Sequence, residues 1–553
     1  MRSLRGGCVA ATLALLPLVY SFKFTSFLHA KEALLDVALV LCVLLRLIEA
    51  RTPQRASRAG RPLLPLWLWL LWALAAAAMH SVQVSSYTVE EGVRIAVLLL
   101  FAGLNGDLLA DRRWRRRIFS ALILGGTLAA ALGGAQFAGL FPALFPGVAG
   151  YDQPMYSVFG NQGLLGGYLA LILPLVLWRY HTAPRIARLL LLVAAAIMGA
   201  AWGLSGARSA WLAGTLGIGL TLWLLRRRRW RCLAPAGVGI LSAIAMLLIT
   251  WTTSGQRLQH TLESSDVGGR ARLWFWDAAL RMTGEHPIAG VGLGNFPYWS
   301  PYYQGLALQA HPGHFHNELH TEHAHSEALE VLAETGCVGL LLALWLLWRV
   351  PRRPGPAVGT LSALMIVSLF NAALHSAPHA LAGLFLAISL CMRPKASASE
   401  SPPVPREVRG WPGPVAAFLA AMLLVAAHFA TTLLPSYYLC AAEDAHLAGN
   451  NADALYQRAL AHPWPNYPAR EGYGMWLLEA QRPAEARIQF EAALRGLDTG
   501  RIHLLLALAA QRLGDHAAMQ AHLEACLLRW PGNAQAVQLL QQQPLPPPFS
   551  PLF

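Results

Sequence analysis

The decisive stretch of this 553-residue sequence is His323-Ala-His325-Ser-Glu-Ala-Leu-Glu-Val-Leu-Ala-Glu334-Thr-Gly336. Before it lies a long polar loop at 254–326, and after it a hydrophobic run continues to Trp348. Because about 20 mostly apolar residues suffice to cross a membrane, this stretch marks the point where a polar insertion enters a membrane span. A large polar insertion between spans is where we expect the chemistry of the protein.

The composition of the whole chain is that of a multi-pass membrane protein. Hydrophobic residues make up 55% of it and charged residues 13%, whereas soluble domains carry about 25% charged residues. We expect twelve or thirteen spans, the shortest of them being 377–392. The predicted segments are 7–22, 32–50, 63–79, 92–110, 118–141, 159–178, 186–204, 209–225, 233–253, 327–348, 358–374, 377–392 and 413–434.

The arginines predict how these spans are oriented. The net charge is +14, and most arginines stand in short clusters between apolar runs, at 51–61, 112–117, 179–188, 226–231 and 349–353. Because positive loops face the cytoplasm, this pattern places the N terminus inside. The loop at 254–326 and everything after residue 434 then lie outside. No basic stretch has a groove-reading or base-stacking pattern, so we expect no nucleic-acid partner.

The C-terminal part differs from the transmembrane domain, which we assign to residues 1–434. A Pro/Ser-rich linker at 393–412 (394–412 in its narrowest definition) separates the last two spans. Similar Ala-rich helix starts recur every 32 residues, at Asn451, Pro483 and Asp515. This period resembles tetratricopeptide repeats of about 34 residues and predicts an α-helical repeat domain over 436–533. Such domains bind other proteins and carry out no reaction.

The last residues of the chain, 534–553, are rich in Gln and Pro, and we expect them to be disordered. Cys440 and Cys526 lie in the same C-terminal domain and could pair if that domain is extracytoplasmic. Their spacing does not decide whether they do.

Within the polar loop, Arg272 and Trp276 are four residues apart and share one face of a short helix. Gly290, Gly292 and Gly294 predict a tight turn whose backbone amides are free to meet an anion. A guanidinium beside such a turn suits phosphate, because it offers a bidentate charged fork. The alternative is that the glycines only form the turn and the arginine is solvated.

His325 lies just before the helical positions, where its imidazole can reach a cavity at the mouth of the span. Histidine exchanges its proton readily near neutral pH, so it can accept one from an attacking hydroxyl. Helical spacing puts Glu327, Glu330 and Glu334 on one face, which we therefore expect to avoid lipid.

Six histidines between residues 311 and 325 raise the alternative of a zinc site. His316 and His320 have helical spacing, but Asn317 stands where an HExxH motif has glutamate. We therefore predict no catalytic metal, with most of these histidines on the loop surface.

Other polar residues lie on the predicted outer side. Arg208, Arg270 and Arg272 are not needed there for orientation, and a charge close to a span is a site hypothesis by default. The alternative for Arg208 is an interfacial arginine. Asn161 and Gln162 open a span from the same side and are candidate polar lids on the cavity.

Taken in order, these elements resemble the O-antigen ligase and polymerase superfamily of membrane glycosyltransferases, over residues 150–390. The matching stretches are Gly160-Asn161-Gln162 with Tyr168-Leu, Ser205 to Ser209, Arg272 to Trp276, His286-Pro with Gly290 to Phe296, and His323-Ala-His325 with Glu334-Thr-Gly336. Two positions depart from the family pattern. Ser326 replaces a frequent Asn, and His375-Ser-Ala-Pro-His379 lacks the Glu-Tyr of the protein-glycosylating branch.

The resemblance implies a GT-C-like helical bundle that moves a glycan from undecaprenyl diphosphate to an acceptor hydroxyl, without cofactor or metal. Arg208 and Arg272 would hold the diphosphate, and His325 would activate or orient the hydroxyl. The candidate substrate-binding residues are His323, Asn161, Gln162, Trp276, Arg270, Asn295, Glu334 and His375.

The resemblance further implies a multi-pass protein of the bacterial inner membrane with a periplasmic C-terminal domain. The acceptor stays open between lipid-A core, a growing glycan and a protein, and the repeats could recruit a protein partner. Two other functions also remain as alternatives: a flippase for lipid-linked glycan, and a scaffold that works only through its repeats.

Overall fold

The computed structural model describes residues 1–49, 63–79, 86–140, 156–225, 230–249, 267–310, 321–349, 356–392, 414–462 and 464–541. Within these ranges every regular element is a helix. The prediction of an all-α fold is therefore confirmed for the part of the chain that the structure covers.

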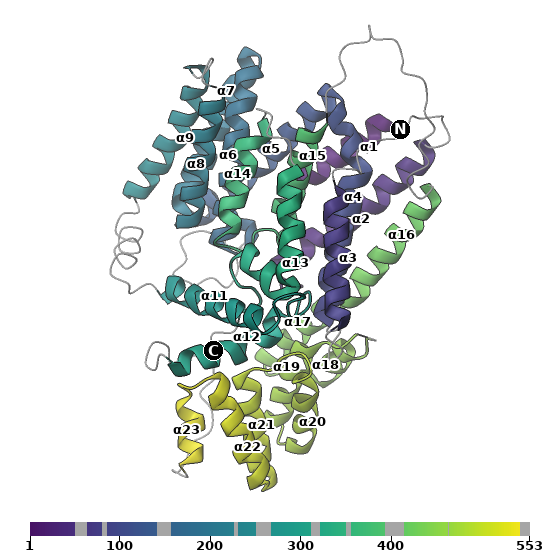
Figure 1. Ribbon diagram of the computed structural model, residues 1–553, viewed down its shortest axis with the longest axis vertical. Helices are drawn as coiled ribbons and strands as arrows, with labels where there is room; N and C mark the ends of the chain where they lie inside the picture. The colour runs from purple at the N-terminus through teal and green to yellow at the C-terminus, as the bar shows by residue number, and fades with distance from the viewer. Residues whose placement is uncertain are drawn as a thin grey trace.

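The first part of the chain forms the helical bundle in the upper half of Figure 1. Its helices are α1 (Arg2–Leu15), α2 (Phe27–Glu49), α3 (Leu64–Met79), α4 (Ser86–Asn105), α5 (Arg112–Phe137), α6 (Gln162–Thr182), α7 (Arg185–Leu204), α8 (Arg208–Leu224), α9 (Trp230–Ile249), α13 (Glu327–Arg349), α14 (Pro356–Ser368), α15 (Ala377–Cys391) and α16 (Pro414–His428). Each predicted apolar segment overlaps one of them.

Fewer of these helices qualify as spans than the twelve or thirteen predicted. In the described ranges, six segments are long and apolar enough to cross a membrane: Ser86–Ala110, Arg112–Phe137, Gln162–Thr182, Arg185–Leu204, Glu327–Arg349 and Val415–Leu447. Four more apolar helices are shorter, at Leu64–Met79, Leu233–Leu248, Ala357–Ser368 and Ala377–Cys391. Helix α2 is long, but it carries charged residues such as Lys31 and Asp36, which are buried inside the bundle.

Helix α6 lies at the centre of the bundle and packs against α5, α7, α8, α9 and α14. Its residues are apolar on all sides, as expected of a helix surrounded by others. Close approach depends on small residues: a side chain at Gly166 would meet Ser205 and Ala207, and one at Gly217 of α8 would meet the Gly359 carbonyl. This packing fixes the N-terminal ends of α6 and α8, where several predicted site residues lie.

The polar insertion and the C-terminal helices lie together below the bundle in Figure 1. The insertion contributes α11 (Val267–Glu285) and α12 (Phe296–Ala310). The C-terminal helices are α17 (Leu434–Leu447), α18 (Asp453–Leu460), α19 (Tyr467–Glu479), α20 (Pro483–Ala493), α21 (Gly500–Leu513), α22 (His516–Arg529) and α23 (Ala534–Leu540). Helix α12 packs so closely on α22 that a side chain at Gly305 would overlap the Leu528 backbone carbonyl.

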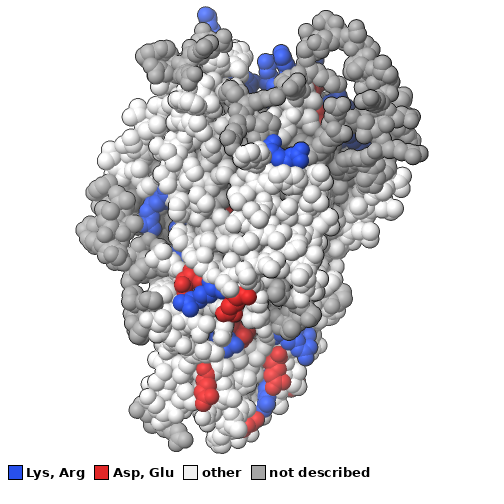
Figure 2. Space-filling view, viewed as in Figure 1, with Lys and Arg blue, Asp and Glu red and all other residues white. Residues whose placement is uncertain are grey.

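Helices of the C-terminal part pack in sequence order, α17 with α18, α19 with α20, and α21 with α22. Figure 2 shows charged side chains gathered over this lower region, while much of the face above it is uncharged. Three helices begin at or near the predicted starts, because Pro483 and the Asp515 side chain open α20 and α22, and Asp453 begins α18. The tetratricopeptide resemblance itself, and the side of the membrane on which these helices lie, stay predictions.

The segment predicted to be disordered begins with a helix instead. Asn533 accepts a hydrogen bond from the Ala536 amide at 2.7 Å, and Leu539 is buried against α21 and α22, so α23 is held in place. Residues 542–553 lie outside the described ranges, as does the predicted linker at 393–412. Cys440 and Cys526 are both free thiols, and Cys526 is buried in the core of the last helices.

Candidate functional site

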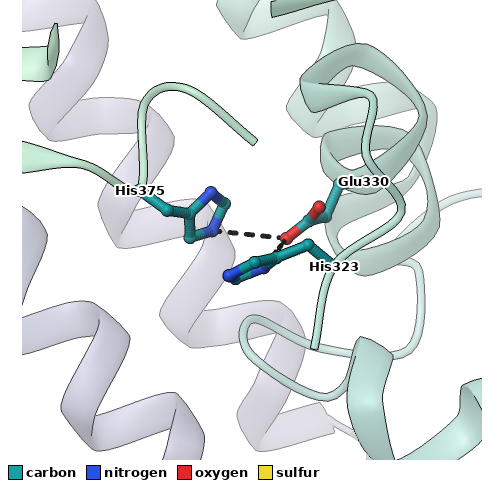
Figure 3. A group of neighbouring side chains, drawn as sticks. All are labelled: His323, Glu330 and His375. Carbon is teal, nitrogen blue, oxygen red and sulfur yellow. Dashed lines mark hydrogen bonds and ion pairs between the residues drawn. The ribbon is translucent and has the colours of Figure 1, made fainter. Parts of the chain in front are cut away.

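A cluster of imidazoles and carboxylates forms where the start of α13 meets the turn between α14 and α15. We call it the His/Glu cluster, made of Glu91, His323, Glu327, Glu330 and His375. Figure 3 shows His323 and His375 approaching the same carboxylate from two sides. His323 Nδ1 lies 2.8 Å from Glu330 Oε1, and His375 Nε2 lies 3.2 Å from the same oxygen. Glu91 Oε1 is 2.8 Å from His375 Nε2.

Arg94 of α4 binds both Glu91 and the backbone beside His375. Its guanidinium binds the Glu91 carboxylate with two hydrogen bonds of 2.5 and 2.6 Å. It also donates to the backbone carbonyls of Leu374 and His375, at 3.2 and 3.0 Å. A planar five-donor group is needed to make all these contacts at once, so Arg94 fixes both Glu91 and the turn that carries His375.

The surroundings of His375 favour its charged form. Burial by itself lowers the pKa of His375, but the carboxylates of Glu330, Glu91 and Glu327 outweigh it and hold the pKa well above its ordinary value. Glu327 also accepts a hydrogen bond of 2.5 Å from the Leu374 amide. The carboxylates of Glu327 and Glu330 thus hold the 371–376 turn, and their face of α13 is buried.

Helix α13 is interrupted at Gly336, and the glycine turn of the insertion fills the break. Gly336 has φ 65° and ψ −170°, which releases carbonyls of the first helical part from their helical partners. The Val291 amide donates to the Ala333 carbonyl at 2.8 Å, and the Gly292 amide to the Glu334 carbonyl at 2.9 Å. The Cys337 amide returns a bond of 2.8 Å to the Pro287 carbonyl.

This exchange corrects the prediction that the amides of the glycine turn are free to meet an anion. The amides of Val291 and Gly292 donate hydrogen bonds to carbonyls of α13, which are exposed by the break at Gly336. Asn295 is likewise committed locally, since its side-chain amide donates to the Val291 carbonyl at 3.0 Å. The carboxylate of Glu334 accepts the Phe296 amide at 3.1 Å and so caps the start of α12.

His325 lies beside the His/Glu cluster in a strained backbone conformation. Its φ of 51° falls in the left-handed region, which a residue with a side chain rarely adopts. The imidazole stacks on Phe275 of α11, with 5.7 Å between ring centroids. Burial, and then the charge of Arg272, lower the pKa of His325 to about 4. Its ring is therefore neutral at physiological pH and can accept a hydrogen bond from a hydroxyl.

Arg272 of α11 lies among polar groups from other helices. Its guanidinium approaches Asn371 Oδ1 at 3.5 Å, and the Asn371 amide donates to the Ser209 hydroxyl at 2.8 Å. Ser209 follows Arg208 at the start of α8. Arg272 is thus linked through Asn371 to Ser209, the residue that follows Arg208 in the sequence. Arg272 is also close enough to His325 to perturb its pKa.

Trp276 lies one turn after Arg272, as its spacing predicts, and packs near Phe370 with 6.3 Å between ring centroids. Its indole N–H is buried and has no acceptor among the described residues. A buried donor without an acceptor is costly, so this group is available to a bound ligand.

The remaining predicted residues have mixed placements. Asn161 caps α6 by accepting the Gly163 amide at 2.7 Å, and Gln162 begins that helix. Asn161 therefore has a structural task in addition to any role as a lid. Arg270 falls within α11, but its side chain lies outside the described part of the chain, as do His316 and His320.

A large cavity connects the His/Glu cluster with the opposite end of the bundle. Its volume is about 2460 Å³, and its walls are mostly apolar residues of α4, α13, α14 and α15. At one end it is lined by Glu91, Glu330 and His375, and at the other by arginines that include Arg112 and Arg349. The cavity can therefore accept a long apolar chain.

One protein-family model matches a part of the chain that contains several of the site residues. Residues 193–344 match the O-antigen ligase family model. The match contains Arg208, Arg272 and His325, and it supports the resemblance to the ligase and polymerase superfamily and a glycosyltransferase-type membrane enzyme. Neither the curated proteins nor the solved structures gave a match.

Arg94, Asn371 and Phe275 also belong to the site, although they were not predicted from the sequence. Arg94 stands inside a predicted span, and a charge in such a place is a functional signal that could have identified it. Asn371 and Phe275 carry no comparable signal, since a lone amide and a buried ring have many ordinary uses. Arg94 and His375 both lie outside the matched residues 193–344.

Proposed function

We propose that the protein transfers an oligosaccharide from undecaprenyl diphosphate to an acceptor hydroxyl at the periplasmic face of the bacterial inner membrane. The observation that carries the proposal is that a positively charged side chain and a neutral imidazole lie side by side. Arg272 supplies a fixed positive charge for a leaving group, and His325 beside it is held neutral by that charge and by burial. A transfer from a diphosphate needs both a cationic holder and an uncharged acceptor of a proton.

The donor is held by its diphosphate. Arg272 and Arg208 bind the phosphate oxygens, with guanidinium forks that match their geometry. The buried indole N–H of Trp276 is a further donor for a glycan or phosphate oxygen. The prenyl chain follows the apolar walls of the cavity, whose volume of about 2460 Å³ suits a long lipid.

In the reaction, the acceptor oxygen attacks the anomeric carbon of the glycan from the side opposite the diphosphate. The new glycosidic C–O bond forms while the bond between that carbon and the phosphate oxygen breaks, with inversion. The hydroxyl proton passes to the neutral ring of His325, and undecaprenyl diphosphate leaves with the bonding electrons. Alignment and electrostatic holding carry most of the catalysis, because the leaving group is already activated. Arginines hold the diphosphate in this scheme, so the transfer step uses no metal.

The acceptor distinguishes three variants of this function. We favour a ligase that transfers to lipid-A core, with a growing glycan or a protein as alternatives. The C-terminal helices pack directly on α12 of the insertion, so a macromolecule bound to them would lie close to the site.

The test is transfer in vitro by the purified full-length protein. Undecaprenyl-diphosphate glycan is offered with lipid-A core, a pilin-like protein or free glycan in separate reactions. We expect product with one acceptor, and a loss of at least about 100-fold in kcat/KM for Arg272→Gln and for His325→Ala. Arg281→Gln is the matched control, because Arg281 lies on the same helix and pairs at the surface with Asp277.

Two results would overturn the proposal. The first is normal transfer by both site variants. The second is failure with every acceptor while the protein moves labelled lipid-linked glycan across liposome membranes, as a flippase does.

A further inference from the structure

We propose that the His/Glu cluster is a binding site for one divalent transition-metal ion of the zinc type, held by His323, Glu330 and His375. This ion lies beside the transfer site and orders it, which goes beyond the function proposed above. It also departs from the metal-free expectation that the family resemblance implies, although the transfer step itself still uses arginine.

The donor atoms come from three separate parts of the chain and converge. His323 belongs to the segment before α13, Glu330 to the first turns of α13, and His375 to the turn between α14 and α15. One donor atom from each lies within 4.8 Å of the other two. Figure 3 shows both rings directed at the Glu330 carboxylate.

The donor set and its spacing suit zinc. Two imidazoles and one carboxylate are the protein ligands of many zinc sites, with bonds of about 2.0–2.1 Å and ligand atoms therefore about 3.3 Å apart. The two distances to Glu330 Oε1 are 2.8 Å and 3.2 Å, so only a slight outward shift is needed to admit an ion. Glu91 Oε1 lies 2.8 Å from His375 Nε2 but falls outside the three-residue group, and both of its oxygens are bound by Arg94, so the fourth ligand position is left to water.

The groups around these donors are arranged as they are around metal ligands. Such imidazoles usually direct their second nitrogen at a carboxylate, and the nearest carboxylate to His375 Nδ1 is that of Glu327, whose Oε1 lies 3.6 Å away, beyond hydrogen-bond distance but close enough to form that bond after a small shift. The second oxygen of Glu330 accepts the Ala324 amide at 3.0 Å, which orients the carboxylate.

The charge balance of the cluster also favours a cation. The carboxylates of Glu91, Glu327 and Glu330 all lie within 3.6 Å of the His375 ring. The guanidinium of Arg94 is committed to Glu91. A proton on His375 supplies one compensating charge, and a divalent ion in its place would supply two.

A bound ion would fix the positions of residues in the transfer site. His323 is two residues before His325, so an ion that fixes His323 to α13 and to the 371–376 turn also fixes the strained backbone of His325. Asn371, which contacts Arg272, belongs to that same turn. One ion would therefore set the distance between the general base and the diphosphate-binding arginine.

The experiment measures metal binding, and it is independent of transfer activity. The loop histidines His311, His314, His316 and His320 would bind zinc on their own, so a fourfold Ala variant of these serves as the starting protein. Full-length protein without an affinity tag is treated with chelator, freed of it, and titrated with Co²⁺ and with Zn²⁺ against a competing chelator. The intensity of the cobalt d–d bands reports whether the ion has four ligands.

We expect one ion per chain in the fourfold variant, with the spectrum of a four-coordinate site. His375→Ala and Glu330→Gln should remove it, and His323→Ala, at a more exposed position, should weaken binding at least 100-fold. Glu327→Gln should weaken it about 10- to 100-fold, as loss of an orienting carboxylate does. The matched control is His446→Ala, which removes an imidazole 2.8 Å from Glu479 in the C-terminal helices and should bind normally.

Thermal unfolding in detergent identifies variants that fail to fold. If His375→Ala does not fold, His323→Ala tests the site in its place. Absence of bound metal in the fourfold variant would overturn the proposal. So would binding that persists unchanged in His323→Ala and Glu330→Gln. Because no glycan is involved, neither result depends on whether the protein is a transferase.

Discussion

The imidazole of His325 stacks on the ring of Phe275, with 5.7 Å between the ring centroids and 27° between the ring planes. The two residues belong to different elements, since Phe275 lies in α11 and His325 in the segment before α13. Their contact joins the helix that carries Arg272 to the candidate proton acceptor. The orientation of the base and the placement of the donor are therefore coupled.

Phe275→Leu tests this coupling, because leucine keeps the site apolar but removes the stacked ring. Aromatic pairs contribute about 0.5–1.5 kcal/mol, so we expect kcat to fall about 2- to 10-fold with little change in KM. Steady-state kinetics of glycan transfer measures it. Leu273→Ala, at an exposed position of the same helix, should leave kcat unchanged, and equal losses in both variants would contradict the coupling.

The lowered pKa of His325 predicts an unusual pH profile. The neutral ring is the active form, and its pKa is lowered to about 4 by burial and by Arg272. Because protonation abolishes the base, kcat/KM should stay level from pH 8 to about 5 and fall only as the pH approaches 4. A rate profile measured with protein whose folding is checked at each pH tests this. An acid limb centred near 6.5, the ordinary value for histidine, would contradict it.

Gly336→Ala should disrupt the break in α13. Its φ of 65° and ψ of −170° lie in a region essentially limited to glycine, which costs a residue with a side chain about 1–3 kcal/mol, and the added carbon would overlap the Ile288 carbonyl. We expect a lower unfolding temperature in detergent together with lost transfer. Gly284→Ala is the control, because nothing lies within 4 Å of an added carbon there. Equal melting of both variants would show that the break tolerates a side chain.

Arg94→Met should be more damaging than its distance from the reacting atoms suggests. Removing one partner of a buried ion pair costs about 3–5 kcal/mol, since Glu91 is left without its guanidinium. The turn at His375 also loses two hydrogen bonds. Unfolding in mixed detergent measures the stability. The double variant Glu91→Met/Arg94→Met should recover part of the loss, and strictly additive effects would contradict the pairing.

Truncation after residue 435 separates an enzyme from a scaffold. It removes the C-terminal helices and the Ser436 hydroxyl, which contacts Thr25 and His29 at 2.8–2.9 Å. If the protein is a transferase, the truncated form should retain reduced transfer while full-length His325→Ala shows almost none. A scaffold would give the reverse, with function lost on truncation and unaffected by His325→Ala.

Much of the bundle could be predicted because membrane spans carry a strong local signal. Every predicted apolar segment falls on a helix, and Arg272 and Trp276 share a helix as their spacing indicates. Helix ends were predicted less well. The 534–540 segment was expected to be disordered because its composition is polar, but burial of Leu539 outweighs that composition.

The site was harder to predict because its contacts join residues far apart in the sequence. Glu91 and His375 are brought together by packing between α4 and the turn before α15, which no local pattern records. The amides of the glycine turn were expected to bind an anion, but their partners depend on the break at Gly336. The break results from the non-helical backbone angles of Gly336, and a glycine inside an apolar run does not by itself indicate such angles.

One helical rod runs from the membrane bundle into the C-terminal part, through α16, a π-turn at Phe429–Leu433 and α17. Its 33 residues from Val415 to Leu447 extend for about 50 Å at 1.5 Å per residue. A continuous helix of this length fixes how far the C-terminal helices stand from the bundle. If those helices bind an acceptor, the helix holds it at a set distance from the candidate site, so that the size of the acceptor matters as well as its chemistry.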